Sequence, residues 1–405
     1  MKILYIATAY PRSESDAITP WLVETVDRLR ASGHEVTMFT SSYRGLGNQV
    51  FHGTPVVRFR YFLRRWETLT HDETAVDRVR RGMRNKVLAL FYMIMGTWSV
   101  WRLCRKNEYD IIHVHWPLPH AVFGYVAALT CRAPMIISFH GVGLMWVKRG
   151  MRVMRPFLRW AIRKAAAITA NSTHTVKAIQ ELHHKHVDIV PFGAAVGEFK
   201  DLPAATSGDR RELLFVGRLV ERKGIPFLMD ATAILARDIP VHLNVVGSGP
   251  DLERLKQRVK DRSHEAFVTM HGNVSPEQLH QQYSDCDVFV LPAIVDAKGD
   301  TEGLGVVIIE AMHYRRPVVA SGIGGIVDLV IDGKTGLQTP PASSDALAGA
   351  IRRILTDHEL AHTLSDGGYE HVQRNYSWPG IIARLDEIYR RVADRRALTD
   401  PEDAA

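Results

Sequence analysis

The sequence predicts an α/β protein made of two doubly wound parallel sheets, each in its own domain. The chain has 405 residues, more than one hydrophobic core usually supports, so two domains are expected. A strand, a helix and a second strand follow one another at the N-terminus, and another alternation begins after residue 211. This order is typical of parallel sheets that carry helices on both faces.

The first half of the chain supplies one alternation. Residues 2–7 are expected as the first strand. Thr19 and Pro20 are suited to cap and open a helix that Gly33 ends. Further strands are expected at 35–40, 110–115, 135–139, 166–170 and 187–190, with short strands within 48–62.

The second half supplies another alternation after a polar stretch at 197–211, which is expected as a linker. A last helix is expected at 376–392, where apolar residues recur at helical spacing, and a frayed tail follows from 394. The strands are expected at 212–216, 242–246, 267–271, 288–291 and 317–320, with a short segment at 336–338, and the helices at 225–235, 251–261, 276–283, 306–314 and 344–356.

Composition is that of a globular protein, with 46% hydrophobic and 23% charged residues. The net charge of +7 favours anionic partners such as nucleotides, phospholipid headgroups or nucleic acid. Cys104, Cys131 and Cys286 lie far apart in the sequence, so neither a metal motif nor a disulfide framework is expected. This cysteine usage fits a reducing cytoplasm.

Three segments stand outside the two alternations. Residues 66–84 are charged and irregular, which predicts a surface loop that could gate a site. Residues 87–101 form the longest uncharged run, but a membrane span needs about 20 apolar residues, so a buried or interfacial helix over 85–104 is expected. Lys148 to Lys164 combine spaced cations with apolar bulk, which indicates a membrane-surface helix or, alternatively, a surface helix with a solvated basic stripe.

Two acids, Glu302 and Glu310, flank a stretch with no other charge. Glycines follow the first acid and an apolar run leads to the second, so Glu302 is expected on a loop and Glu310 about two turns into a helix. The free N–H groups at a helix start suit an anion such as a phosphate. The alternative is a pair of structural acids bonded to arginines.

Two cations, Arg218 and Lys223, follow a strand that ends in Gly217. Ligands of α/β proteins bind at the carboxyl ends of strands, and two cations there suit a diphosphate. A salt-bridged turn is the alternative.

Other motifs argue against common activities. The turn from Gly247 to Pro250 has no third glycine at Leu252, so NAD binding is disfavoured and a tight turn is preferred. Asp285 and Asp287 precede a strand, which indicates a turn rather than a metal site. The parts of a hydrolase triad or an ATPase phosphate loop are absent from the sequence.

Three histidines lie on predicted strands. His113 and His115 share one face of a strand, but no third metal ligand can be assigned. His115 and Trp116 are expected to form a pocket wall. His140 ends a strand just before Gly141, and this position favours a catalytic over a core histidine.

With these motifs in place, the chain resembles the retaining glycosyltransferases of family 4, which have the GT-B fold. The ordered set of motifs covers most of the chain and is more specific than any single one. The motifs are Gly217-Arg218 with Lys223-Gly224, residues 246–250, His271-Gly272, Pro292, Glu302 with Glu310 after seven intervening residues, residues 317–321, Gly324-Gly325, Asp332-Gly333 with Gly336-Leu337, and Phe139-His140-Gly141.

The resemblance implies two Rossmann-like domains facing a central cleft. The acceptor-side domain would span 1–196, and the nucleotide-sugar-binding domain 212–375. The helix at 376–393 would cross back onto the N-terminal domain, coupling the two through Trp378 and Tyr389.

The resemblance also implies roles for the motif residues. Arg218 and Lys223 would hold the donor diphosphate and stabilise the leaving nucleotide, and Glu310 would bind the ribose hydroxyls. Glu302 would contact the donor sugar and His140 the sugar and the reacting centre, so these two are the expected catalytic residues. Gly303, Leu304 and Gly305 would offer backbone amides to sugar and phosphate.

The chain departs from the family pattern after the first strand. Many members have a Gly-Gly pair there that approaches the donor phosphate, whereas residues 9–16 read Ala-Tyr-Pro-Arg-Ser-Glu-Ser-Asp. Arg12 or other loop amides could substitute, and Arg12, His115 and Trp116 are the expected acceptor-side residues. Asp328 stands where a glutamate is common.

The function implied is metal-independent transfer of a hexose or N-acetylhexosamine, with retention, to a glycan or lipid-linked acceptor in cell-envelope synthesis. The first-choice donor is a UDP-sugar and the second GDP-mannose, with no cofactor and no nucleic-acid partner. The protein is expected in the cytoplasm, with peripheral contact at the inner membrane face through Lys148 to Lys164. The alternatives are a GT-B sugar-nucleotide epimerase and a non-catalytic membrane- or nucleic-acid-binding module.

Overall fold

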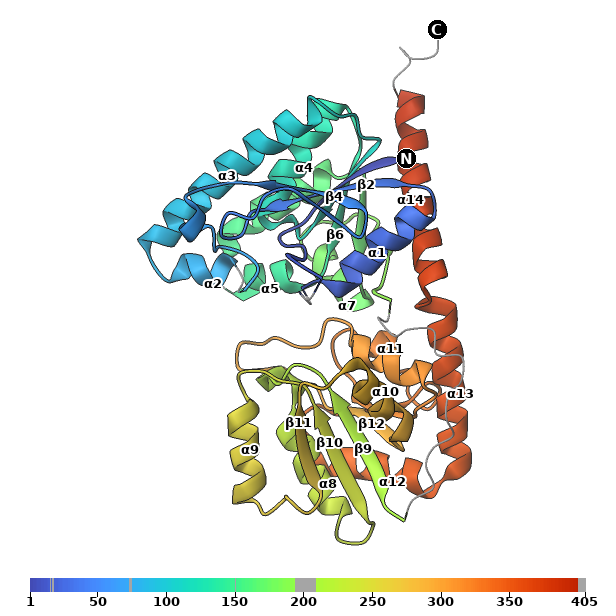
Figure 1. Cartoon of the computed structure of the whole chain (residues 1–405). Helices are drawn as coiled ribbons and strands as arrows, with labels where there is room; N and C mark the ends of the chain where they lie inside the picture. Colours follow the sequence, from blue (N-terminus) through green and yellow to red (C-terminus); the bar gives the residue numbers. More distant parts are fainter. Residues whose placement is uncertain (15, 17, 73–74, 150, 194–208, 400–405) are drawn as a thin grey trace. The chain divides into compact units, whose positions relative to one another are not determined.

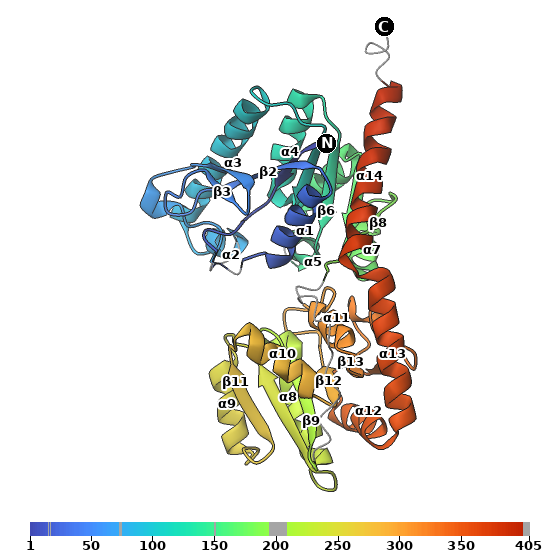
Figure 2. The same ribbon diagram turned by 45° about the vertical axis from the view of Figure 1, so that its right-hand side comes forward.

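The computed structural model describes all of the chain except residues 15, 17, 73–74, 150, 194–208 and 400–405. The chain divides into two compact units, each with one sheet (Figures 1 and 2). The first unit comprises Met1–Asn171, Thr175–Val190 and Ile381–Ala405, and the second Ser172–His174 and Pro191–Gly380. The fold class predicted from the sequence is confirmed. Most of the expected linker, residues 197–208, lies outside the described residues.

The first unit is built on an eight-stranded sheet in the order β3-β4-β2-β1-β5-β6-β7-β8. Its neighbours run parallel except β3 and β4, which form an antiparallel edge. Every residue of the central strands β5 and β6 is buried, as expected where helices cover both faces of a parallel sheet. The strands are β1 Lys2–Ile6, β2 Glu35–Ser41, β3 Gln49–Phe51, β4 Thr54–Phe59, β5 Ile111–His115, β6 Met135–Phe139, β7 Ala167–Ala170 and β8 Asp188–Ile189.

The helices of the first half correct two expectations. Lys148 to Lys164 do not form one helix, because α5 ends at Arg149 and Pro156 lies in the first turn of α6. Residues 66–84 are not only a loop, since they include α2. The helices are α1 Pro20–Ala31, α2 Ala75–Arg80, α3 Met83–Cys104, α4 Pro117–Cys131, α5 Val142–Arg149, α6 Arg155–Lys164 and α7 Thr173–Gln180, with 3₁₀ turns at Arg64–Trp66 and Arg152–Met154.

The start of α1 also differs in detail from the prediction. Thr19 adopts a left-handed conformation, with φ of 49°, and its side chain makes no capping hydrogen bond. Pro20 opens the helix as expected, because its fixed φ suits the first helical position.

The second unit contains a fully parallel six-stranded sheet in the order β11-β10-β9-β12-β13-β14. A helix that the sequence prediction missed, α13, follows α12 after the single residue Asp357, whose side chain caps it. The strands are β9 Arg211–Val216, β10 Val241–Val246, β11 Val268–Gly272, β12 Val288–Leu291, β13 Val318–Ser321 and β14 Leu337–Thr339. The helices are α8 Ile225–Leu235, α9 Leu252–Asp261, α10 Pro276–Asp285, α11 Val306–His313, α12 Ser344–Thr356 and α13 His358–Asn375, with 3₁₀ turns at Glu221–Lys223 and Ile326–Asp328.

The last helix, α14 at Trp378–Thr399, extends beyond the expected end at residue 392, so residues 394–399 are helical rather than part of a frayed tail. From Ile381 onward it belongs to the first unit, where Leu385 and Ile388 join the hydrophobic core. Its Tyr389 hydroxyl lies 2.7 Å from the Tyr5 hydroxyl on β1 and 2.8 Å from His113 Nδ1 on β5. The predicted return of the chain to the N-terminal domain is therefore confirmed.

Candidate functional site

The cationic and acidic motifs of the second unit meet at one edge of its sheet. β9 and β12 are parallel neighbours, so the loops after them emerge at the same edge. Lys223 follows β9 and Glu302 follows β12, and Lys223 Nζ lies 2.5 Å from Glu302 Oε2. Only 6% of Lys223 is exposed. The structure thus joins two motifs that are far apart in the sequence into a largely buried ion pair.

The ion pair keeps Glu302 charged. Burial alone would raise the pKa of its carboxyl group, but the charge and hydrogen bond of Lys223 lower it, helped by Arg222. The net pKa shift is downward, so Glu302 is a carboxylate at neutral pH. An incoming anion would compete with Glu302 for Lys223.

Glycines hold the loop that carries Glu302 in place. A Cβ atom on Gly324, where φ is 60°, would lie 2.1 Å from the Glu302 carbonyl oxygen. The Gly325 amide donates to the same oxygen at 3.0 Å. A similar close approach joins the loops after β9 and β12, because a Cβ on Gly224 would lie 1.9 Å from the Pro292 carbonyl oxygen. The Gly324-Gly325 motif therefore serves a close approach of two backbones.

The start of α11 lies directly after this loop. Its N-cap residue is Gly305, with φ of 88°, and no side chain caps the helix. The first amides of such a helix lack intrahelical partners and carry the positive end of its dipole. Next to Lys223, they favour an anionic group.

Glu310 lies further along α11 and has a different partner. The Tyr283 hydroxyl donates to Glu310 Oε2 at 2.7 Å. Burial raises the pKa of Glu310 to about 7, against the opposing effect of this hydrogen bond. Among the described residues, Glu302 pairs with a lysine and Glu310 with a tyrosine. The alternative, in which both acids are structural and bonded to arginines, predicted different partners.

Arg218 is a solvent-exposed cation at the same edge of the sheet. Its side chain is exposed, and within the described part of the chain it has no hydrogen bond or ion pair. Its loop is held by the turn after β10, because a Cβ on Gly247 would lie 2.0 Å from the Gly217 carbonyl oxygen. A Cβ on Gly249 would likewise lie 2.3 Å from the Leu219 carbonyl oxygen, so these glycines permit a tight turn against the Arg218 loop.

A stack of histidines marks the carboxyl ends of β5 and β6 in the first unit. His115 Nδ1 and His140 Nε2 lie 3.0 Å apart, and their rings stack at 5.2 Å. The rings of Trp21 and Trp116 each lie 4.9 Å from the His140 ring. Burial, with His113 nearby, lowers the pKa of His140 to about 3, so its ring is neutral at pH 7.

His113 has a structural environment. Its ring bonds the Tyr389 hydroxyl at 2.8 Å and the Ser138 hydroxyl at 2.7 Å. In the described parts of the chain, no three His, Cys, Asp or Glu side chains are grouped so as to hold a metal ion.

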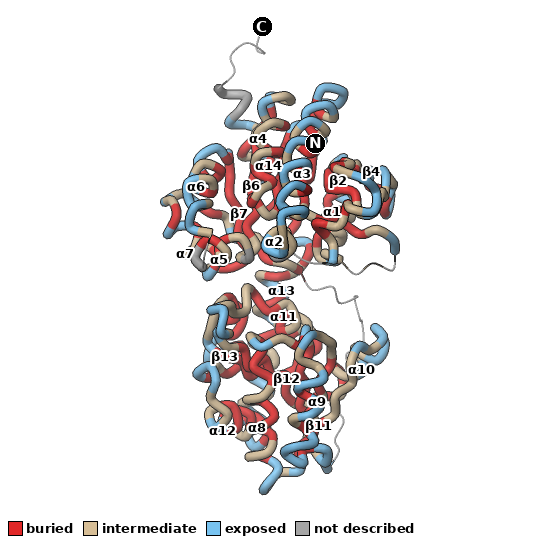
Figure 3. The backbone as a smooth tube through the Cα atoms, turned by 90° about the vertical axis from the view of Figure 1, so that its left-hand side faces the viewer, coloured by how far each residue is buried: buried red, intermediate tan, exposed pale blue. Residues whose placement is uncertain are grey.

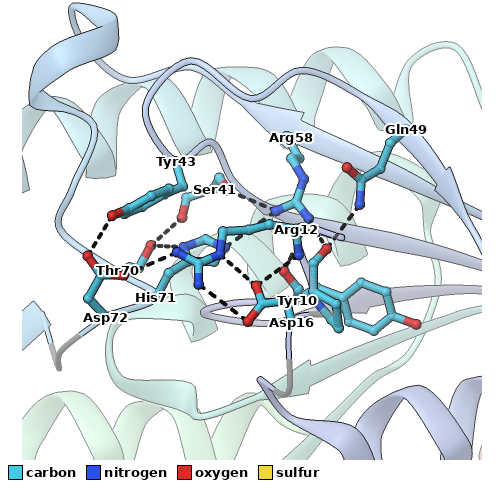
Figure 4. A network of polar contacts seen from close by, with 11 residues as sticks. Tyr10, Arg12, Asp16, Ser41, Tyr43, Gln49, Arg58, Thr70, His71 and Asp72 are labelled. Carbon is cyan, nitrogen blue, oxygen red and sulfur yellow. Dashed lines mark hydrogen bonds and ion pairs between the residues drawn. The ribbon is translucent and has the colours of Figure 1, made fainter. Parts of the chain in front are cut away.

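Arg12 belongs to a polar network over the loop after β1 (Figure 4). Its Nε lies 2.6 Å from Asp16 Oδ2, and its Nη1 lies 3.1 Å from Asp72 Oδ1. The guanidinium also lies over the Tyr43 ring, 4.8 Å from its centre. Arg12 is thus already paired with two carboxylates, and none of its described contacts is with His115 or Trp116.

Arg58 on β4 anchors the same loop and was missed in the sequence. Its Nη2 donates to the Pro11 carbonyl oxygen at 2.6 Å and to the Tyr10 carbonyl oxygen at 3.1 Å. It is 4% exposed, and burial lowers its pKa to about 10. The available signal was a single arginine in an otherwise uncharged strand.

The fold and the site define a class of protein. Two Rossmann-like units, one with cations, a carboxylate and a helix start at its strand ends, are typical of transferases that use nucleotide-activated substrates. Residues 18–193 match the Glycosyl transferase 4-like domain, and residues 199–371 match Glycosyl transferases group 1. The chain belongs to this family of glycosyltransferases.

Similar proteins agree with this membership. A GDP-mannose-dependent alpha-(1-6)-phosphatidylinositol monomannoside mannosyltransferase of Mycobacterium tuberculosis is 28% identical over 71% of this chain and 78% of its own. A putative teichuronic acid biosynthesis glycosyltransferase of Bacillus subtilis is 26% identical over 97% and 99%. The structure of Anabaena HepE with UDP and glucose shares the fold, with a TM-score of 0.70, 19% identity, and coverage of 96% and 100%.

The chain is therefore an enzyme, a nucleotide-sugar-dependent glycosyltransferase of family 4. Its relatives act in glycolipid and cell-envelope polysaccharide synthesis. This family membership argues against the alternative of a non-catalytic binding module.

Proposed function

We propose that the protein transfers a hexose or N-acetylhexosamine from a nucleotide-diphosphate sugar to a glycan or lipid-linked acceptor, without a metal and with retention. The observation that carries the proposal is the buried pair of Lys223 Nζ and Glu302 Oε2 at the edge of β9 and β12. Retention rests on membership of the family.

The donor diphosphate would take over the cations of this edge. Arg218 is open to solvent and offers a forked donor, while Lys223 offers a point charge. When the diphosphate binds Lys223, Glu302 is released and its carboxylate accepts hydrogen bonds from hydroxyls of the donor sugar. As the bond from the anomeric carbon to the diphosphate breaks, these cations and the amides of residues 303–305 stabilise the charge on the leaving nucleotide.

Glu310 would bind the ribose. A carboxylate accepts hydrogen bonds from two neighbouring hydroxyls, and Tyr283 holds one of its oxygens at 2.7 Å. Since the pKa of Glu310 is raised to about 7, donor binding would be weaker where Glu310 is protonated, below this pH.

His140 would contact the donor sugar as a neutral ring. Its partner His115, 3.0 Å away, fixes the ring orientation. His115 and Trp116 would then border the acceptor, whereas Arg12 would act by shaping the loop, because two aspartates already hold it.

A UDP-sugar is the first-choice donor of this proposal and GDP-mannose the second; similar proteins described with each support both choices. A panel of both, with donor hydrolysis measured in soluble protein, separates them. A lipid-linked acceptor, as named for the mycobacterial relative, would require a peripheral position at the inner membrane face.

Three variants test the site: Arg218→Ala, Lys223→Ala and Glu302→Gln. Each should lower transfer at least about a hundredfold. The two cation variants lose charge stabilisation of the leaving nucleotide, and Glu302→Gln loses the carboxylate that accepts hydrogen bonds from the sugar hydroxyls. Lys256→Ala is the matched control, because Lys256 pairs with Glu253 on the exposed face of α9. Wild-type rates in all three site variants would refute the proposal. An epimerised donor formed without acceptor would show that the enzyme is an epimerase rather than a transferase.

Two further measurements test the remaining parts of the proposal. The anomeric configuration of the product tests retention. Turnover measured in the presence of a metal chelator tests metal independence, and it should be unchanged.

A further inference from the structure

Helix α3 packs against the rest of the first unit through one face. The inward residues recur every fourth position and include Leu88, Tyr92 and Gly96. The Tyr92 hydroxyl lies 2.9 Å from His120 Nε2 on α4. A Cβ on Gly96 would lie 2.4 Å from the Phe123 ring, so the two helices pack in close contact. This face fixes α3 in the fold.

Much of α3 is exposed, as the pale blue stretches of its tube show (Figure 3), and the exposed side chains on the face opposite the packed one are apolar. Surface helices of globular proteins normally present polar residues there. Seven large side chains at helical spacing are between 39% and 71% exposed: Met83, Val87, Leu90, Phe91, Ile94, Trp98 and Trp101. Trp98 and Trp101 also line a shallow apolar groove toward Val122 and Val126 of α4. An apolar surface of this extent indicates a partner.

The charges around this face are all positive within α3. Residues 83–104 contain no acid, while Arg84 and Arg102 lie near the two ends. The Arg102 guanidinium lies 5.4 Å from the centre of the Trp98 ring, and Arg105 lies 5.1 Å from that of Trp101. Tryptophan beside arginine suits the boundary between acyl chains and anionic headgroups.

From this face we propose that α3 docks the protein on an anionic phospholipid bilayer, lying in the plane of the interface. This names the surface for the membrane contact included in the proposed function, and it does not depend on sugar turnover. α3 is long and apolar enough to cross a membrane, but its inward face is locked against α4, so it inserts only its outer face.

A second copy of the chain fits this face less well. Two copies joined through α3 would bring arginines together with no acid of α3 to pair with them, which disfavours the contact. The segment from Lys148 to Lys164 is also less suited to insertion. The apolar side chains Leu158 and Ile162 of α6 are buried, so α6 offers cations without an exposed apolar face.

Vesicle sedimentation of the full chain tests the inference. The vesicles contain phosphatidylcholine alone, or with about a third phosphatidylglycerol. The wild type should bind the anionic vesicles. Trp98→Ser/Trp101→Ser should bind at least about tenfold more weakly, since two aromatic groups that would insert into the bilayer are lost. Val50→Ser is the control, because Val50 on β3 is 71% exposed and lies outside both α3 and the segment from Lys148 to Lys164.

Two further measurements separate the outcomes. Donor hydrolysis in solution should be unchanged in the double variant, which shows that it is folded and keeps the proposed function distinct from docking. Binding that is equal in wild type and double variant, or equal with neutral and anionic vesicles, would overturn the inference. So would a lipid-free dimer in analytical ultracentrifugation that the same variant abolishes, because the face would then join two copies.

Discussion

At the level of single residues, the buried pair of Lys223 and Glu302 should matter for stability as well as for the proposed transfer. Removing one partner leaves the other charge buried without compensation. Lys223→Met should therefore lower the free energy of unfolding by about 2–4 kcal/mol in urea denaturation, and the double variant with Glu302→Leu should recover part of this loss. Lys256→Ala breaks an exposed pair and should cost less than about 1 kcal/mol. Equal effects of the buried and exposed changes would contradict this prediction.

Glu310 should make stability depend on pH in a defined direction. Its pKa is raised from 4.5 to about 7, so the folded state holds a proton that the unfolded state has lost. The free energy of unfolding should therefore fall as pH rises from about 4.5 through 7, by up to about 3 kcal/mol from this group. Glu310→Gln should remove that fall, measured as the difference between the two stability–pH curves. Parallel curves would show that Glu310 titrates normally.

The sequence predicted the types of site residue better than their partners. The spacing of Glu302 and Glu310 indicated a loop acid and a helix acid, which agrees with α11. It could not show that Lys223 neutralises Glu302, because that contact depends on β9 and β12 being neighbours in the sheet. Arg58 escaped detection for a similar reason, since its partners are backbone carbonyl groups of a distant loop.

At the level of elements, the Gly324-Gly325 turn should set the position of the Glu302 loop. A Cβ at Gly324 would meet the Glu302 carbonyl oxygen at 2.1 Å and would also face a φ of 60°. Gly324→Ala should therefore cost about 1–3 kcal/mol in stability and lower transfer, since the loop must move.

Gly349→Ala in α12 is the matched control for this turn. Nothing lies within 4 Å of a Cβ there, and the residue is helical. The change should stabilise the protein by about 0.5–1 kcal/mol. Similar effects at the two glycines would show that the close approach at Gly324 is unimportant.

Elements with clear end signals were predicted to the residue. α12 starts after Ser343, whose side chain caps it, and its predicted bounds agree with the structure. The predicted single helix from Lys148 to Lys164 was wrong because Pro156 would interrupt the hydrogen bonds of a helix interior. α13 was missed because its first residues are polar and only one residue separates it from α12.

For the whole molecule, the two parallel sheets and the returning helix followed from the order of the motifs. The path of α14 was implied by the family resemblance rather than by local signals. Its apolar face indicated only that it packs against some core. The structure adds that this core belongs to the first unit, where the Tyr389 hydroxyl contacts Tyr5 on β1 and His113 on β5. The two ends of the chain therefore stabilise one unit together.

Tyr389→Phe should test this joining of the chain ends. The change keeps the ring but removes the hydroxyl that lies 2.7 Å from Tyr5 and 2.8 Å from His113, leaving buried polar groups without this partner. It should lower the free energy of unfolding by about 1–3 kcal/mol and increase amide hydrogen exchange in β1, β5 and α14. Tyr369→Phe is the control, because Tyr369 is a partly exposed residue of α13 whose ring contacts Arg315. If both variants unfold at the same denaturant concentration as the wild type, the last helix does not depend on this hydroxyl for its attachment to the first unit.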